Sequence, residues 1–222
     1  MGKLITLTAA DGHTLDAYRA DPQGKARGGL VVAQEIFGVN HHIRAVCDGF
    51  AEAGYLAVAP ALFDRSRKKV EFGYTPDDIA KGREIMQTLD LNNAMKDMAA
   101  AAAVVKAAGK VGVVGYCWGG TVAWASATRL DGIAASVCYY GGGIGGLAAE
   151  KPRCPVMLHF GDQDQSIPME VVEKVRAAHP ALPLYVYHAG HGFNCDARGS
   201  YHAESAKLAL DRTLGFLREH VG

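Results

Sequence analysis

Short apolar runs alternate with longer stretches of helical periodicity along almost the whole chain. This alternation is typical of a mostly parallel β-sheet that is covered by helices. The predicted strands are residues 3–8, 14–20, 29–34, 55–59, 111–114, 133–139, 156–160 and 184–187. We therefore predict an α/β fold with a central sheet of about eight strands flanked by helices.

Turn and cap residues indicate how these strands are connected. Asp11 and Gly12 form a hairpin-type turn signal, so the first two strands should pair antiparallel. Asn40 and Gly54 are typical of the cap and the stop of a helix, and Pro76 is typical of a first helical position. The other predicted helices are the alanine-rich run 98–103 and residues 202–220.

The composition is that of an ordinary globular protein. Hydrophobic residues make up 49% of the 222 residues and no linker, repeat or charge block divides them, so we expect one domain over residues 1–222. Basic and acidic residues both number 23, which leaves no basic excess for nucleic acid or an anionic membrane. No stretch resembles a signal peptide or approaches the roughly 18–20 apolar residues of a membrane span. We expect a cytoplasmic monomer without nucleic-acid or membrane partners.

The cysteines are an odd and scattered set without a C-x-x-C pair, which argues against a disulfide framework and against a zinc site. They are Cys47, Cys117, Cys138, Cys154 and Cys195. The sequence also lacks a nucleotide-binding glycine pattern and a metal-ligand cluster. We therefore expect no cofactor, no metal and at least one free thiol.

The most informative stretch is residues 111–123, VGVVGYCWGGTVA. An apolar strand runs into a helix through Gly115-x-Cys117-x-Gly119, the pattern of a nucleophile elbow with cysteine in the usual serine position. Glycine is needed on both sides because the strand and the helix approach closely at this turn. The turn should present Cys117 at the carboxyl edge of the sheet and at a helix N-terminus, which favours thiolate. The alternative interpretation is a plain glycine-rich turn with a small hydrophobe at its centre.

Acid and histidine candidates follow the last two predicted strands. Asp162 and Asp164 come after the seventh strand, and His188 and His191 come after the eighth. We favour Asp164, which lies three residues past Gly161 as in related hydrolases, although either acid could cap the turn instead. We favour His191 because glycines on both sides let a loop present it. A thiol, a carboxylate and an imidazole in this order are typical of α/β-hydrolases, in which the imidazole shuttles the proton and the carboxylate orients it.

Over nearly its whole length the chain resembles the dienelactone hydrolase (carboxymethylenebutenolidase) family. The matching segments are VAQEIFGVN at 32–40, GYCWGG at 115–120, G-x-x-D-x-x-I-P at 161–168 and GHGF at 190–193. The resemblance implies an α/β-hydrolase fold. It also implies that Cys117, His191 and Asp164 hydrolyse a small-molecule ester or lactone through a thioacyl-enzyme intermediate.

The resemblance assigns further roles around the cysteine. Glu35 would contact the resting thiol and help to form the thiolate when substrate enters, since a partly desolvated carboxylate can accept the thiol proton. The backbone N–H groups of Ile36 and Trp118 would form the oxyanion hole. The side chains of Phe37 and Trp118 would line the substrate pocket. A plainer interpretation of Glu35 is a negative charge placed favourably near the helix that starts around Asn40.

One departure from the family concerns the substrate. Members that act on chlorinated dienelactones hold the substrate carboxylate with two arginines, one of them four residues after the catalytic histidine, where this chain has Cys195. Arg83 and Lys81 lie in the region of the second arginine. The sequence leaves open whether either reaches the site and whether the substrate carries a carboxylate. It also leaves open whether Tyr139 and Tyr140 line the pocket or pack in the core.

Two other functions are compatible with a cysteine elbow. A glutamine amidotransferase also uses cysteine, histidine and an acid, but the acid loop is of the hydrolase type and no synthetase segment is present. A non-catalytic small-molecule binder or redox sensor would oxidise Cys117 rather than acylate it. Such a sensor does not require Asp164, His191 and Glu35, so we favour the hydrolase.

Overall fold

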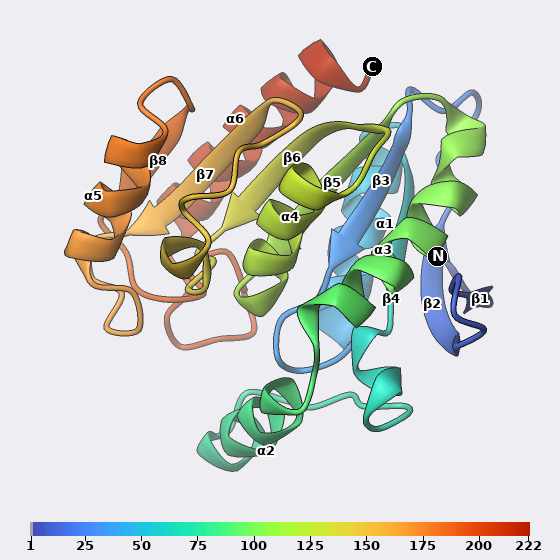
Figure 1. The fold of residues 1–222 in the computed structure, drawn as a ribbon, viewed down its shortest axis with the longest axis horizontal. Helices are drawn as coiled ribbons and strands as arrows, with labels where there is room; N and C mark the ends of the chain where they lie inside the picture. The colour runs from blue at the N-terminus through green and yellow to red at the C-terminus, as the bar shows by residue number, and fades with distance from the viewer. Residues whose placement is uncertain (1) are drawn as a thin grey trace.

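The computed structural model describes residues 2–222. A single sheet of eight strands forms the centre of the fold (Figure 1). The strands are β1 (Lys3–Thr8), β2 (Thr14–Ala20), β3 (Gly29–Ala33), β4 (Leu56–Pro60), β5 (Val111–Tyr116), β6 (Ile133–Tyr139), β7 (Val156–Gly161) and β8 (Leu184–Tyr187). Their order in the sheet is β1-β2-β4-β3-β5-β6-β7-β8. β2 pairs antiparallel with β1 and β4, and all other pairs are parallel. The predicted fold class and its antiparallel start are confirmed.

Helices cover both faces of the sheet. They are α1 (His41–Glu52), α2 (Pro76–Gln87), α3 (Leu91–Val105), α4 (Trp118–Arg129), α5 (Met169–Ala178) and α6 (Ala203–His220). In Figure 1, α3 and α4 lie on the face toward the viewer, and α1 and α6 lie behind the sheet. α2 stands apart from both layers, beyond the carboxyl ends of the strands. Within residues 2–222, no helix has both the length and the apolar character that crossing a membrane requires.

The helix starts follow the signals in the sequence. Asn40 caps α1, and its side-chain oxygen accepts a backbone N–H of the first turn at 3.3 Å. Gly54, just after α1, has a φ of 98°, which favours glycine. Thr75 and Asp78 form a capping box at the start of α2. α2 buries only Gly82 and Ile85, so the capping box adds stability to a helix that has little tertiary packing.

One strand differs from prediction where it meets the site. β5 continues to Tyr116 instead of ending at Val114, while the other strand ends differ by at most one residue. Gly115 favours an early end in isolation, because glycine weakens a strand. Parallel pairing with β6 overrides this preference, since Gly115 and Tyr116 lie opposite Cys138 and Tyr139. The rigid sheet therefore reaches the residue directly before Cys117.

Candidate active site

Cys117 stands in the tight turn between β5 and α4. Its φ of 56° lies in the left-handed region, which is uncommon for a residue with a side chain and recurs at functional turns. A Cβ on Gly115 would lie 1.9 Å from the carbonyl oxygen of Gly119, and one on Gly119 would lie 2.2 Å from that of Ala33. Only glycine therefore permits this approach of strand and helix. The half-buried thiol sits at the N-terminus of α4, at the carboxyl edge of the sheet.

Histidine and acid converge on this thiol. His191 Nε2 lies 3.1 Å from Cys117 Sγ, and its Nδ1 lies 2.6 Å from Asp164 Oδ2. The other oxygen of Asp164 accepts the backbone N–H groups of Ser166 and Ile167, at 2.8 and 3.2 Å. These bonds fix the buried carboxylate, which in turn fixes the imidazole with Nδ1 as donor and Nε2 toward the sulfur.

The competing acid and histidine pair with each other at the surface. Asp162 Oδ2 lies 3.1 Å from His188 Nδ1, and both side chains are exposed. Neither contacts the thiol or the buried pair. The structure thus brings Asp164 and His191 together with Cys117 and leaves Asp162 and His188 outside.

The charges of this site favour a protonated imidazole. Burial disfavours charge on His191, but the negative charge of Cys117 and the hydrogen bonds to Asp164 and Cys117 outweigh it and raise the pKa of His191 to about 10. The arrangement therefore supports a thiolate–imidazolium pair, the nucleophilic form of a cysteine hydrolase.

Glu35 lies fully buried in the loop after β3, and its partners differ from those that the family resemblance implies for the resting state. Arg198 Nη1 donates to Glu35 Oε1 at 3.2 Å, and the Tyr74 hydroxyl donates to Oε2 at 3.4 Å. Burial, followed by the charge of Glu35, raises the pKa of Tyr74, so its hydroxyl stays a donor. In this conformation Glu35 is neutralised by an arginine, and the thiol of Cys117 bonds to His191 instead.

Sequence reasoning missed Arg198. It lies seven residues after His191, beyond the position at which the family places its arginine. The loop returns to the site because Gly192, with a φ of 77°, lets it double back; a Cβ on Gly192 would lie 2.5 Å from Arg198 Nη1. The guanidinium also lies 5.6 Å from the centre of the Phe37 ring. An arginine in the histidine loop was the available signal, but only the loop conformation shows where it points.

The residues of the proposed oxyanion donors, Ile36 and Trp118, line the same cavity as Cys117. Trp118 opens α4, and among residues 2–222 no acceptor is bonded to its backbone N–H or to that of Ile36. The carbonyl of Ile36 is pressed against α2, where a Cβ on Gly82 would lie 2.1 Å from the carbonyl oxygen. Helix α2 therefore buttresses the peptide segment that carries one of the two donors.

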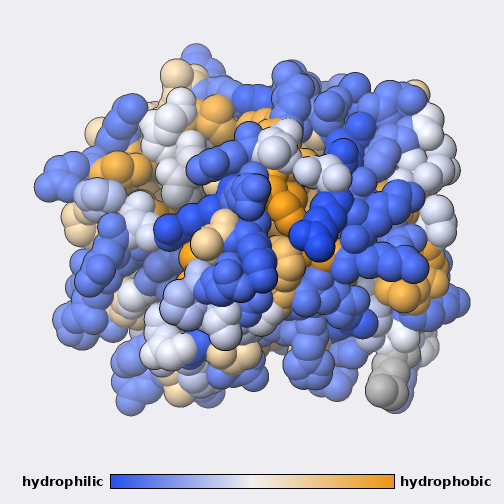
Figure 2. Space-filling model, turned by 90° about the horizontal axis from the view of Figure 1, so that it is seen from below, coloured by the Kyte–Doolittle hydropathy of each residue, from blue (hydrophilic) through white to orange (hydrophobic). Residues whose placement is uncertain are grey.

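A cavity of about 570 Å³ opens beside Cys117 and His191. Its apolar lining consists of Ile36, Phe37, Ile79, Met86, Leu89, Trp118 and Ile167. Figure 2, which views the protein from the side of α2, shows apolar residues in a hollow near the middle of this face, surrounded by hydrophilic ones. Arg83 and Arg198 add two positive charges to the cavity wall. The site thus fits a small, largely apolar molecule with a negatively charged group.

The structure also settles which of the remaining candidates reach the cavity. Arg83 lines it, whereas Lys81 points to the exposed side of α2 and binds Asp77 at 2.6 Å. Tyr139 and Tyr140 are fully buried and pack in the core. The ring centre of Tyr140 lies 5.2 Å from that of His191, so the buried tyrosine ring packs against the imidazole.

The strand order and the cysteine turn with its histidine and acid define an α/β-hydrolase. The model of the dienelactone hydrolase family matches residues 15–221, and the chain therefore belongs to that family. The resemblance predicted from the motifs is confirmed, and with it the assignment to ester and lactone hydrolases.

Relatives match along nearly the whole chain. An Escherichia coli K12 protein with the provisional name carboxymethylenebutenolidase is 33% identical, covering 98% of this chain and 87% of the relative. A protein of the same provisional name from Azospirillum brasilense is 34% identical, covering 98% and 99%. A crystal structure from Klebsiella pneumoniae, provisionally described as a dienelactone hydrolase, has a TM-score of 0.84 at 30% identity, covering 98% of this chain and 100% of that one.

Proposed function

We propose that the protein hydrolyses a small ester or lactone through a thioester on Cys117. The observation that carries the proposal is the 3.1 Å contact of His191 Nε2 with Cys117 Sγ at the wall of an apolar cavity. The thiolate attacks the acyl carbon and forms a carbon–sulfur bond, while the carbonyl electron pair moves to oxygen. That oxyanion accepts hydrogen bonds from the backbone N–H groups of Ile36 and Trp118.

Collapse of this intermediate breaks the bond between the acyl carbon and the leaving oxygen. His191 gives its Nε2 proton to the leaving alkoxide, which stays tethered to the acyl group when the substrate is a lactone. A water molecule then attacks the thioester and passes a proton to His191, and Cys117 departs as thiolate. Asp164 holds the imidazole in position for both proton transfers.

Arg198 supports a role for Glu35 in this cycle. Arg198 lines the cavity and neutralises Glu35 at the same time. A substrate carboxylate that binds Arg198 weakens this pair and raises the proton affinity of Glu35. When Cys117 rests as a thiol, Glu35 then accepts its proton, which leaves the thiolate beside the imidazolium of His191 with which the cycle begins, and Glu35 returns the proton after product release. With Arg83 on the same wall, the arrangement favours an ester or lactone that carries a carboxylate. One chain supplies every group, so we propose action as a monomer.

The test compares the wild type with Cys117→Ala on p-nitrophenyl esters and on small enol lactones with and without a carboxylate. We expect activity in the wild type and, with a slow ester, a covalent acyl adduct on Cys117 in the intact mass. Equal rates in both proteins would eliminate the cysteine mechanism. Release of ammonia from glutamine would instead favour the amidotransferase, and oxidation of Cys117 without any acyl adduct would favour the redox sensor.

A further inference from the structure

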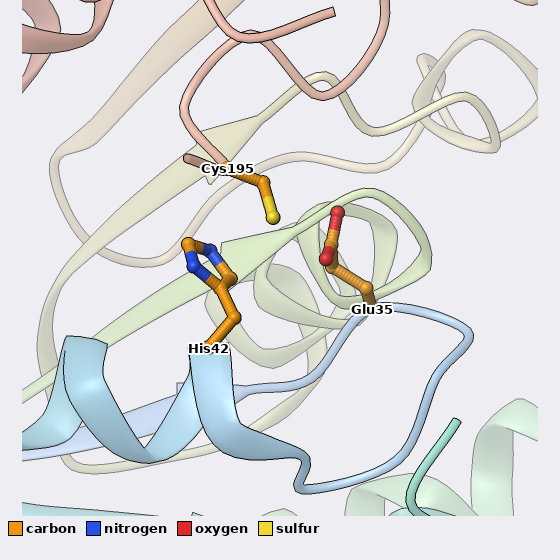
Figure 3. A group of neighbouring side chains, drawn as sticks. All are labelled: Glu35, His42 and Cys195. Atoms are coloured by element: carbon orange, nitrogen blue, oxygen red, sulfur yellow. The ribbon is translucent and has the colours of Figure 1, made fainter. Parts of the chain in front are cut away.

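Three buried side chains from distant parts of the chain meet behind the active site (Figure 3). Glu35 follows β3, His42 lies in the first turn of α1, and Cys195 lies in the loop after β8. One donor atom from each lies within 4.8 Å of the others. Figure 3 shows the sulfur of Cys195 between the imidazole of His42 and the carboxylate of Glu35. Carboxylate, imidazole and thiol together form a donor set that suits zinc-type cations.

The hydrogen bonds of His42 leave one ring nitrogen free. Its Nδ1 lies 3.3 Å from Asp196 Oδ1, whereas Nε2 is shielded from solvent and has no partner among residues 2–222. His42 is only 6% exposed, and leaving a buried polar atom without a partner costs about 1–3 kcal/mol. An imidazole that contacts a carboxylate through one nitrogen and offers the other is the usual form of a histidine metal ligand.

The charges around the cluster balance when a divalent cation is present. Cys195 is fully buried and forms no disulfide, so its sulfur is available to a cation. A bound cation displaces the thiol proton to solvent and binds the sulfur lone pair. The thiolate, Glu35 and Asp196 then carry three negative charges, which match the cation and Arg198.

We propose that Glu35, His42 and Cys195 bind a thiophilic divalent cation of the zinc type, with water as a further ligand. Tetrahedral zinc holds its ligands about 3.5 Å apart, so donors that lie within 4.8 Å of one another need to converge by at most about 1.3 Å. Glu35 Oε2 is the oxygen available for the cation, because its present bond to Tyr74 is long at 3.4 Å. The three ligands are far apart in the chain and lack a spacing motif, so a sequence pattern could not predict the site.

Such a cation also affects the active site, an effect that rests on the proposed function. Glu35 is the group that we propose to accept the thiol proton of Cys117, and a cation bound to its carboxylate removes that basicity. Zinc at this position therefore lowers hydrolase activity without touching the Cys117–His191 pair. The cluster would make the enzyme sensitive to thiophilic metal ions.

The test is a titration of the chelator-treated full-length protein with Co²⁺, followed by absorption spectroscopy. We expect one Co²⁺ per chain, with a thiolate-to-cobalt charge-transfer band and the visible bands of tetrahedral cobalt. Cys195→Ser should abolish the charge-transfer band, and His42→Ala should weaken binding at least tenfold. Cys117→Ala and Cys154→Ser should leave the spectrum intact, because their thiols lie outside the cluster. Circular dichroism checks that each variant folds. If Cys195→Ser does not fold, His42→Ala tests the site independently.

Three results would overturn the proposal: no thiolate band in the wild type, a band that persists in Cys195→Ser, or a band that is lost in Cys117→Ala, which would place the ion at the catalytic pair. Activity supplies a second readout. Zn²⁺ should inhibit ester hydrolysis by the wild type and lose that effect on Cys195→Ser, and equal inhibition of both would remove the link to Glu35. If the protein proves not to hydrolyse esters, the cobalt spectra still decide whether the site exists.

Discussion

The carboxylate of Glu35 is bound to the guanidinium of Arg198, 163 residues away in the chain, at 3.2 Å. Both side chains are largely buried, and Arg198 is also part of the cavity wall. The same arginine therefore neutralises an internal acid and offers a positive charge to the substrate. In the proposed function, this pair links recognition of an anionic substrate to the protonation state of Glu35.

Replacing Arg198 tests this link. In Arg198→Met, we expect KM for a carboxylate-bearing ester to rise about 10- to 100-fold, the equivalent of a charged hydrogen bond of about 1.5–3 kcal/mol. KM for a neutral ester of similar size should change much less. Steady-state kinetics with the two esters measures the difference. A parallel rise in both KM values would show that Arg198 does not bind the carboxylate.

The variant should also lose stability, because Glu35 is left buried without its partner. Removal of one member of a buried ion pair costs about 3–5 kcal/mol. The double variant Glu35→Gln, Arg198→Met should recover most of this loss in urea denaturation. If the single variant is as stable as the wild type, the pair is not formed in solution.

His191 should titrate far above a normal histidine. Burial lowers the pKa of His191, but the charge of Cys117 and the hydrogen bond that His191 Nδ1 donates to Asp164 outweigh burial and raise the pKa to about 10 from an ordinary 6.5. Its contribution to the free energy of unfolding is therefore fully present below about pH 6.5 and is lost as the pH rises through about 10. An NMR titration of the imidazole measures the midpoint. In Cys117→Ala, which lacks the thiolate charge, we expect the midpoint to fall by several pH units; an unchanged midpoint contradicts the ion pair.

Local signals account for what the sequence predicted. The strands are short apolar runs, the helix starts are marked by Asn40 and Pro76, and the Gly-x-Cys-x-Gly turn is a contiguous steric requirement. Each depends on residues within a few positions of one another. The order of cysteine, acid and histidine then follows from the parallel sheet, since the carboxyl ends of its strands share one edge.

Contacts made by irregular loops could not be predicted in this way. The loop after His191 has no periodicity, so its return toward Glu35 and the position of Arg198 depend on Gly192 and on packing with residues over a hundred positions away. For the same reason, nothing in the local sequence indicated that Cys195 would lie beside His42. Loop conformation, rather than strand or helix propensity, determines this half of the site.

Helix α2 should control catalysis through Gly82. A methyl group at this position meets the carbonyl oxygen of Ile36 at 2.1 Å, so Gly82→Ala must displace the peptide segment next to the proposed oxyanion donor. We expect kcat to fall about 10- to 100-fold, because misplacement of a reacting group by about 1 Å can cost two orders of magnitude. Steady-state kinetics on a p-nitrophenyl ester measures kcat.

Gly215→Ala is the matched control for this change. Gly215 lies in α6, and a Cβ there meets no other atom within 4 Å. Alanine in an open helical position stabilises by about 0.5–1 kcal/mol, so this variant should retain wild-type kcat with slightly higher stability. Equal loss of kcat in both variants would show that the effect comes from the helices in general and not from the Ile36 contact.

The two aspartates of the acid loop provide the sharpest test of the triad. Asp164 is buried and accepts a hydrogen bond from His191 Nδ1 at 2.6 Å, whereas the side chain of Asp162 pairs with the exposed His188 at 3.1 Å. In Asp164→Asn the amide can present its NH₂ group to Nδ1, which favours the wrong tautomer, and kcat should fall by about 10²–10⁴. Asp162→Asn makes the same chemical change two residues away and should leave kcat within about twofold of the wild type, since exposed ion pairs contribute about 0–1 kcal/mol. A larger loss in Asp162→Asn than in Asp164→Asn would reverse the assignment, because it would mean that the exposed acid orients the catalytic imidazole.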